Sequence, residues 1–184
     1  PAHRRWDPVT QANFAFGYGL SASSLQLARA YAVLANDGVR KEVSLVAVDG
    51  MPEGSKIIDS VLTDELRYML QAATGPKGTG KKANIKGYTV GGKTGTLHKT
   101  NSAGGYHKSR YMSAFAGFAP IEQPRLVTVV VIDEPSIGGY FGGIVAAPVF
   151  SEVTGTALRL MQVTPDQMKT NGSLVKSPAS TLRG

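Results

Sequence analysis

The sequence predicts an α+β fold in which an antiparallel sheet is flanked by helices. Three strand-like segments follow one another at residues 88–97, 111–119 and 126–132, and the short turn at residues 120–125 allows an antiparallel hairpin. Apolar residues recur at helical spacing in three other segments. Because hairpins join the strands, the alternating strand–helix order of a parallel sheet is not expected.

In the first half of the chain we expect a loop, two helices and a small hairpin. Residues 1–10 are polar and basic, which favours the loop. Ser23 or Ser24 can cap a helix that runs to about Asp37, where Gly38 is a natural left-handed stop. The other elements are expected at residues 44–48 and 55–58 (strands) and 60–73 (a helix). The inward faces of the two helices are expected to comprise Leu27, Tyr31 and Leu34, and Leu62, Leu66, Met69 and Ala73.

The second half is expected to end in a helix and a tail. A flexible loop at residues 75–82, rich in Gly, Lys and Pro, precedes the three strands. A last helix is expected to start near Pro148, a favourable first-turn proline, and to continue to about Met161. Its buried face is expected to comprise Phe150, Val153, Ala157 and Leu160. Residues 164–184 have the Ser, Thr, Pro and Lys content of a disordered tail, which leaves residues 1–163 as one domain.

Composition excludes several classes of function. The 184 residues contain no cysteine, so disulfides and thiolate metal sites are excluded. His3, His98 and His107 show no metal-ligand spacing, and we expect neither a metal nor a cofactor. The net charge of +7 comes from scattered Lys and Arg without a basic stripe, so a nucleic-acid partner is not expected. There is no apolar run long enough to span a membrane.

The segment Gly92–Thr96 fits two unrelated kinds of active site. Residues 87–94 match the phosphate-loop pattern G-x-x-x-x-G-K-[ST], and the apolar run before Asp133 could present a magnesium-binding carboxylate. A phosphate loop, however, needs a buried strand before it and a helix that starts at its Lys-Thr pair. The lead-in at residues 81–86 is basic, and Gly95 follows Thr94 with no helical periodicity after it. A phosphate-loop nucleotide hydrolase is therefore a remote alternative.

The second interpretation takes Lys93-Thr94-Gly95 as the K-T-G triplet of penicillin-binding proteins and serine β-lactamases. Further segments accompany this triplet in a fixed order: FGYGL at residues 16–20, LQLA at 25–28, LANDG at 34–38, GKTGT at 92–96, FAGFAP at 115–120, VIDEP at 131–135, GYFGG at 139–143 and AAPVF at 146–150. With these segments the chain, from about residue 14 to residue 163, resembles class B penicillin-binding proteins, the division-specific peptidoglycan transpeptidases of Gram-negative bacteria.

The resemblance implies a fold, an activity and a location. Residues 1–163 would be the C-terminal portion of a transpeptidase domain with a penicillin-binding-protein and serine β-lactamase-like fold. The activity would be the cross-linking of D-Ala-D-Ala stem peptides through a serine acyl-enzyme, which β-lactams inhibit covalently. The expected location is the periplasmic face of the inner membrane, with an N-terminal anchoring helix that is not in this chain. Septal division proteins are the expected protein partners.

The triplet also has a chemical rationale. The stem peptide ends in a carboxylate, and Lys93, Thr94 and Thr96 supply a cation and two hydroxyls that could form charge-assisted hydrogen bonds with it. Gly95 would let the substrate backbone lie alongside the strand. By resemblance, Lys93 points into the catalytic hydrogen-bond network and the Thr96 backbone N–H is an oxyanion donor. Strand alternation puts Thr94 and Thr96 on one face and Lys93 on the other, so local twist or bulging is expected.

Aromatic residues are the remaining candidates for substrate binding. By resemblance, Tyr111, Tyr140 and Phe141 lie near the substrate cleft, where β-lactam side chains also pack. Tyr18 is expected to form or support the opposite wall of that cleft. Ordinary core or edge packing is the alternative for each of them, and for Tyr18 it is the favoured one.

A nucleophile is not evident in this chain. The family uses S-x-x-K and then S-x-N upstream of the K-T-G strand, and residues 1–92 contain neither in a credible place. The one literal S-x-x-K, at residues 173–176, lies after the last helix, and we reject it. The nucleophile is therefore expected on a missing or separately numbered segment, and this polypeptide alone should be inactive. A non-catalytic relative that binds peptidoglycan or a division partner is the main alternative.

Overall fold

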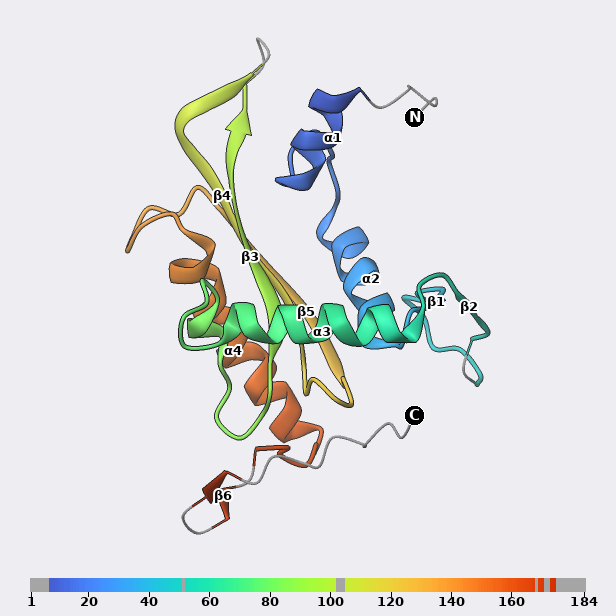
Figure 1. The fold of residues 1–184 in the computed structure, drawn as a ribbon. Coiled ribbons are helices and arrows are strands. Elements are labelled where there is room, and N and C mark those ends of the chain that lie inside the picture. The colour runs from blue at the N-terminus through green and yellow to red at the C-terminus, as the bar shows by residue number, and fades with distance from the viewer. Residues whose placement is uncertain (1–6, 51, 102–104, 168, 171–172, 175–184) are drawn as a thin grey trace, which may run out of the picture.

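The computed structural model describes residues 7–50, 52–101, 105–167, 169–170 and 173–174 (Figure 1). An antiparallel sheet with the strand order β3-β4-β5 forms its centre. These strands are β3 (Gly91–Thr100), β4 (Tyr106–Ala119) and β5 (Leu126–Asp133). The predicted α+β class and antiparallel sheet are confirmed.

Helices cover both faces of this sheet. Phe115 and Phe118 of β4 are fully buried and, at an odd spacing along the strand, point to opposite faces. Phe115 packs against Phe150 of α4 (Gly142–Leu160), with ring centroids 4.7 Å apart. On the other face Phe118 meets Tyr31 of α2 (Ser24–Ala35) at 6.5 Å. The result is a three-layer arrangement of α4, sheet and α2.

The helix α3 (Ser60–Thr74) crosses β3 and fixes its start (Figure 1). The hydroxyl of Thr74, the last residue of α3, donates to the carbonyl oxygen of Val90 at 2.7 Å. The short 3-10 helix η1 (Lys81–Ala83) follows and packs on α4. The main core lies where these elements meet the sheet. Its buried members are Ala83, Ile85, Tyr88, Val90, Phe115, Ala119, Ala146, Ala147, Phe150 and Leu158.

Two short elements in the first half differ from the expectation. The strand expected at residues 44–48 is wrong, because β1 (Val39–Lys41) directly follows Gly38 and pairs with β2 (Gly54–Lys56). The expected loop at residues 1–10 instead includes the start of α1 (Pro8–Ala15), for which Asp7 is the N-cap. An acidic N-cap followed by proline is a helix-start signal, and here it outweighed the polar composition.

Both long helices expose apolar side chains that were expected to be buried. On α3 the buried residues are Thr63, Arg67 and Thr74, whereas Leu62 and Met69 are 49 and 64 % exposed. On α4, Val153 and Leu160 are 52 and 80 % exposed. This helix starts at Gly142, well before Pro148, so the predicted start was also wrong. Helical periodicity identifies an apolar stripe but not which neighbouring element covers it.

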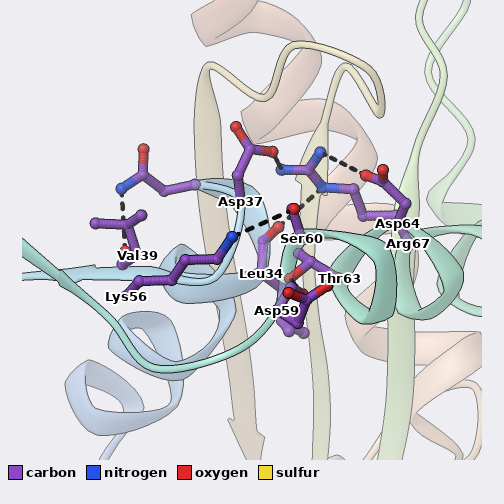
Figure 2. Close-up of polar contacts among 10 residues, drawn as sticks. Leu34, Asp37, Val39, Lys56, Asp59, Ser60, Thr63, Asp64 and Arg67 are labelled. Carbon is purple, nitrogen blue, oxygen red and sulfur yellow. Dashed lines mark hydrogen bonds and ion pairs between the residues drawn. The ribbon is translucent and has the colours of Figure 1, made fainter.

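Arg67 takes the place of an apolar residue on the inner face of α3 (Figure 2). Its guanidinium donates to the carbonyl oxygen of Leu34 at 2.8 Å and pairs with Asp37 at 2.8 Å and Asp64 at 3.4 Å. Asp37 has a φ of 51° just after the end of α2. One buried cation therefore ties the end of α2 to the middle of α3.

The residues after α4 contact the body of the domain. The Asp166 carboxylate accepts hydrogen bonds from the backbone N–H of Thr89, at 2.7 Å, and from its hydroxyl. The Gln167 N–H donates to the carbonyl oxygen of Gly87 at 3.0 Å. Beyond them the structure describes β6 (Lys169–Thr170) and β7 (Ser173–Leu174), and the remainder of the expected tail lies outside the described residues. The boundary at residue 163 stays a prediction.

Candidate active site

The four residues of the proposed catalytic segment lie in sequence on β3. In the described part of the chain β3 is an edge strand of the sheet, so alternate backbone groups along it point away from β4. The Lys93 side chain is exposed, and its Nζ donates to the carbonyl oxygen of Thr94 at 3.1 Å. Thr96 lies opposite Ser113 of β4. The pairing of β3 with β4 is regular from Gly91 to His98, so the bulge that was expected near Lys93 is not found. Strand alternation therefore puts Lys93 on the opposite face from Thr94 and Thr96.

The same geometry excludes a phosphate loop. Lys93 and Thr94 lie inside a strand that continues to Thr100 and turns back into β4. A phosphate loop needs a helix N-terminus at this point, because its backbone N–H groups and its dipole bind the phosphates. The antiparallel sheet also excludes a phosphate-loop fold, because that fold requires parallel strands.

Thr94 and Thr96 both face the first turn of α4. The Thr96 hydroxyl oxygen accepts a hydrogen bond from the Gly142 N–H at 3.0 Å. The Thr94 side chain lies beside Gly143, and its hydroxyl oxygen is 3.1 Å from that of Thr79. The expectation that Thr94 and Thr96 share a face is therefore met in the structure, and neighbouring residues of one helix contact both of them.

Two glycines at the start of α4 make this approach possible. A Cβ on Gly142 would collide with the carbonyl oxygens of Gly95 and Ala114, and a Cβ on Gly143 would collide with the carbonyl oxygen of Thr79. The helix can therefore reach the strand only with glycine at both positions. Its N-terminus, which has a partial positive charge, lies next to the Thr96 hydroxyl.

Three of the four predicted aromatic residues form one group beside this segment. Tyr111 and Tyr140 stack with centroids 3.9 Å apart and an interplanar angle of 10°, and Tyr140 meets Phe141 at 4.5 Å. Burial and the neighbouring Tyr140 raise the pKa of Tyr111. The Ser113 hydroxyl donates to the Tyr140 carbonyl oxygen. Phe141 remains 56 % exposed, so the group presents an apolar surface to solvent next to Thr96.

Tyr18 lies elsewhere. Its ring forms a T-shaped pair with that of Tyr106, with centroids 5.8 Å apart, and Tyr106 is the first residue of β4, at the far end of the β3–β4 hairpin. Figure 1 shows α1 and the segment after it beside this end of the hairpin. The structure therefore brings Tyr111, Tyr140 and Phe141 together with the K-T-G segment, and it places Tyr18 against the hairpin. A role of Tyr18 in substrate binding stays a prediction.

A cluster of charged residues links the three strands at the end of the sheet beside the aromatic group. Lys99 of β3 bonds Asp133 at 2.8 Å and Glu134 at 2.6 Å, and Arg110 of β4 also bonds Glu134. The hydrogen bonds from Arg110 and Lys99 lower the pKa of Glu134 to about 2. Glu134 has a φ of 49°, and its N–H donates to the Tyr111 carbonyl oxygen at 3.0 Å. Asp133 and Glu134 thus end β5 at a turn and are paired with cations.

Sequence reasoning missed Thr79 and Ser113, whose hydroxyls contact Thr94 and the Tyr140 backbone. A signal for Thr79 existed, because it stands between Gly78 and Gly80 in the segment that was expected to be a flexible loop. Among the described residues there is no group of three potential metal ligands, and none of the helices has the length and apolar character of a transmembrane span. The rejected S-x-x-K lies partly outside the described residues.

A K-T-G triplet on a strand is typical of the penicillin-recognising class of serine acyl-transfer folds. Here the triplet lies on an edge strand, the first turn of α4 contacts two hydroxyls of that strand, and an aromatic group adjoins it. Residues 2–155 match the model of the penicillin binding protein transpeptidase domain. The chain therefore belongs to the penicillin-binding protein transpeptidase family, and the expected resemblance is confirmed.

Known relatives agree with this assignment. The chain is 41 % identical over 176 residues to the probable peptidoglycan D,D-transpeptidase PenA of Neisseria flavescens, covering 96 % of this chain and 44 % of that protein. It is 40 % identical over 170 residues to the peptidoglycan D,D-transpeptidase FtsI of Escherichia coli K12, covering 92 % of this chain and 29 % of that protein.

A solved structure agrees as well. The apo transpeptidase domain of Burkholderia pseudomallei penicillin-binding protein 3 superposes with a TM-score of 0.82 at 41 % identity, covering 88 % of this chain and 49 % of that one. The chain thus spans about half of that domain, and less than half of either relative named above.

Proposed function

We propose that this chain is the C-terminal half of a peptidoglycan D,D-transpeptidase domain and binds the C-terminal carboxylate of a D-Ala-D-Ala stem peptide. The observation on which this depends is the arrangement of Lys93, Thr94 and Thr96 on an edge strand beside the first turn of α4. The family and the relatives' names support the proposal.

The hydrogen-bonding state of Thr96 suits an anion. A hydroxyl has one hydrogen to donate and two lone pairs that accept. The Thr96 oxygen accepts from the Gly142 N–H, so its own O–H remains able to donate. A carboxylate only accepts, and an O–H donated to it forms a charge-assisted hydrogen bond. The N-terminus of α4 adds partial positive charge beside the Thr96 hydroxyl, and the exposed Lys93 is a cation on the same strand.

The reaction requires a nucleophile that this chain does not supply in a credible place. In the proposed step a serine hydroxyl of the other half of the domain attacks the penultimate D-Ala carbonyl, and D-Ala leaves with the serine proton. The acyl group is then transferred to the amine of a second stem peptide. The Thr96 backbone N–H is the proposed oxyanion donor; removing one such donor typically slows acyl transfer by about 10²–10³. β-Lactams would acylate the same serine.

The cellular setting follows from the same proposal. Stem peptides lie in the cell wall, so the working place would be the periplasmic face of the inner membrane, with septal division proteins as partners. The aromatic group formed by Tyr111, Tyr140 and Phe141 would bind the side chain of a β-lactam.

The test is intact-mass analysis after exposure to benzylpenicillin. A chimaera that joins the first half of the B. pseudomallei transpeptidase domain to residues 1–184 supplies the half of the fold that this chain does not span. We expect one penicilloyl adduct, on a serine of the first half, and none on the 184-residue chain alone. Lys93→Met should reduce the rate of adduct formation, whereas Lys77→Met, in the turn before Thr79, should not.

A folded chimaera without an adduct would contradict the proposal. It would favour the alternative, a non-catalytic relative that binds peptidoglycan or a division protein.

A further inference from the structure

We propose that Thr79 is a positioning residue that orients the Thr94 hydroxyl toward the substrate carboxylate; the inference rests on the role proposed above for Thr94. Thr79 lies in the turn between α3 and η1. Its hydroxyl oxygen is 3.1 Å from the Thr94 hydroxyl oxygen, and either atom can be the donor.

Several hydrogen bonds hold this turn in place. The Gly80 N–H donates to the Ala73 carbonyl oxygen at 2.9 Å. The Asn84 amide donates to the Thr74 carbonyl oxygen at 2.9 Å, and the buried Thr74 hydroxyl donates to the Val90 carbonyl oxygen at 2.7 Å. The last bond ties the end of α3 to the segment that leads into β3. Thr79 is therefore held at a defined position relative to Thr94.

The first turn of α4 packs against both Thr79 and Thr94. Gly143 lies against the Thr79 carbonyl oxygen and beside the Thr94 side chain, with no space for a Cβ. Gly80 is buried, and its Cα faces the ring of Phe115. Thr79 itself is exposed, but the backbone on either side of it packs against α4 and Phe115, which limits how far Thr79 can move away from Thr94.

The chemistry of a carboxylate decides the direction of the hydrogen bond. If Thr94 donates to Thr79, it has no hydrogen left for the substrate. Because a carboxylate only accepts, a bound substrate favours the arrangement in which Thr79 donates to Thr94 and Thr94 donates to the carboxylate. Hydrogen bonds in such a chain polarise one another and strengthen the final one.

Thr96 shows the same arrangement with a different donor. Its oxygen accepts from the Gly142 N–H, which leaves its O–H for the ligand. Thr79 would do for Thr94 what the Gly142 backbone does for Thr96. Both hydroxyls would then be oriented before the substrate arrives.

The decisive variant is Thr79→Val, which removes the hydroxyl and keeps the branched shape. In the chimaera we expect acylation by benzylpenicillin to slow by about 3- to 10-fold, the usual effect of one hydrogen bond. Acylation by the methyl ester of benzylpenicillin, which has no carboxylate, should change much less. Thr79→Ser should restore the rate. In a protein that already carries Thr94→Val, the further substitution Thr79→Val should not slow acylation any more. Thr156→Val, on the exposed face of α4, is the matched control.

Three results would overturn the inference: an unchanged rate for Thr79→Val with the free acid, an equal loss with the acid and the ester, or no recovery with Thr79→Ser. A wild-type chimaera that forms no adduct would instead count against the proposed function. In that case the inference can still be tested by NMR on the 184-residue chain alone, because three-bond couplings of the Thr94 methyl group report the χ1 rotamer of Thr94. Thr79→Val should broaden the Thr94 rotamer distribution and Thr79→Ser should not; equal distributions would refute the inference.

Discussion

At the scale of single residues, the glycines near the site fall into two kinds. A Cβ on Gly142 would collide with backbone carbonyl oxygens, whereas a Cβ on Gly95 would meet only the Ala114 Cβ, at an ordinary 3.7 Å. Packing within the described residues therefore requires glycine at position 142 but not at position 95. Under the proposed function, Gly95 keeps space for the substrate backbone.

Alanine substitutions at these two positions should separate folding from function. We expect Gly142→Ala to lower the free energy of unfolding by about 1–3 kcal/mol, as overpacking does, and to slow acylation of the chimaera. Gly95→Ala should leave stability within about 0.5 kcal/mol and slow acylation by about 10- to 100-fold, because a small misplacement of the substrate is costly. Urea denaturation and intact-mass kinetics measure the two effects. A stable Gly95→Ala protein that acylates normally would contradict the role of Gly95.

Arg67 offers a residue-scale prediction about stability. Its side chain is 8 % exposed, while Asp37 and Asp64 are 69 and 62 % exposed and can be rehydrated when the cation is removed. The Leu34 carbonyl oxygen would lose its partner. We therefore expect Arg67→Met to destabilise the fold by about 1–3 kcal/mol. Arg29→Met, which removes an exposed pair with Glu42, should cost less than about 1 kcal/mol. Equal urea midpoints for the two variants would show that burial of Arg67 is unimportant.

At the scale of elements, the Lys99, Arg110, Asp133 and Glu134 cluster joins the three strands at one end of the sheet. The pKa of Glu134 is lowered from 4.5 to about 2, so its ionised form is favoured in the folded state. The stabilisation is thus fully present above pH 4.5 and is lost as the pH falls toward 2. Glu134→Gln should be less stable than wild type at neutral pH, and the difference should shrink over that interval. A difference in unfolding free energy that does not vary with pH would contradict this.

The helices and strands also show which parts of the fold local sequence patterns can predict. The main sheet, α2 and α3 could be predicted, because alternation, a Ser cap and apolar periodicity are local signals. The start of α4 could not, since Pro148 is a valid first-turn residue and the true start depends on Gly142 packing against β3 and β4. Lys93, Thr94 and Thr96 were identified by motif. Thr79 was missed because its contact with Thr94 depends on how α3 and β3 pack.

At the scale of the whole molecule, the chain exposes two apolar stripes. They comprise Val61, Leu62, Tyr68 and Met69 on α3, and Val149, Val153 and Leu160 on α4. Contiguous apolar patches are uncommon on the surface of a soluble monomer and often mark an interface. Because the chain spans about half of the B. pseudomallei domain, we infer that the other half of the fold packs on these stripes.

Dye binding can test this inference. The 184-residue chain should bind the apolar dye ANS, and the chimaera should bind less of it per molecule because the stripes become covered. Leu62→Gln with Met69→Gln should reduce dye binding by the isolated chain and destabilise the chimaera. Equal binding by the chain and the chimaera would mean that the stripes stay open. Val43→Gln, a similarly exposed residue outside both stripes, is the control.

The open edge of β3 has a consequence for handling this protein. Among the described residues no strand pairs with this edge, and an edge that can bind an extended peptide can equally bind a strand of another copy. The accessibility that the proposed reaction needs is therefore also a route to aggregation. A bound substrate analogue that occupies the edge would be expected to act as a solubilising agent as well as a ligand.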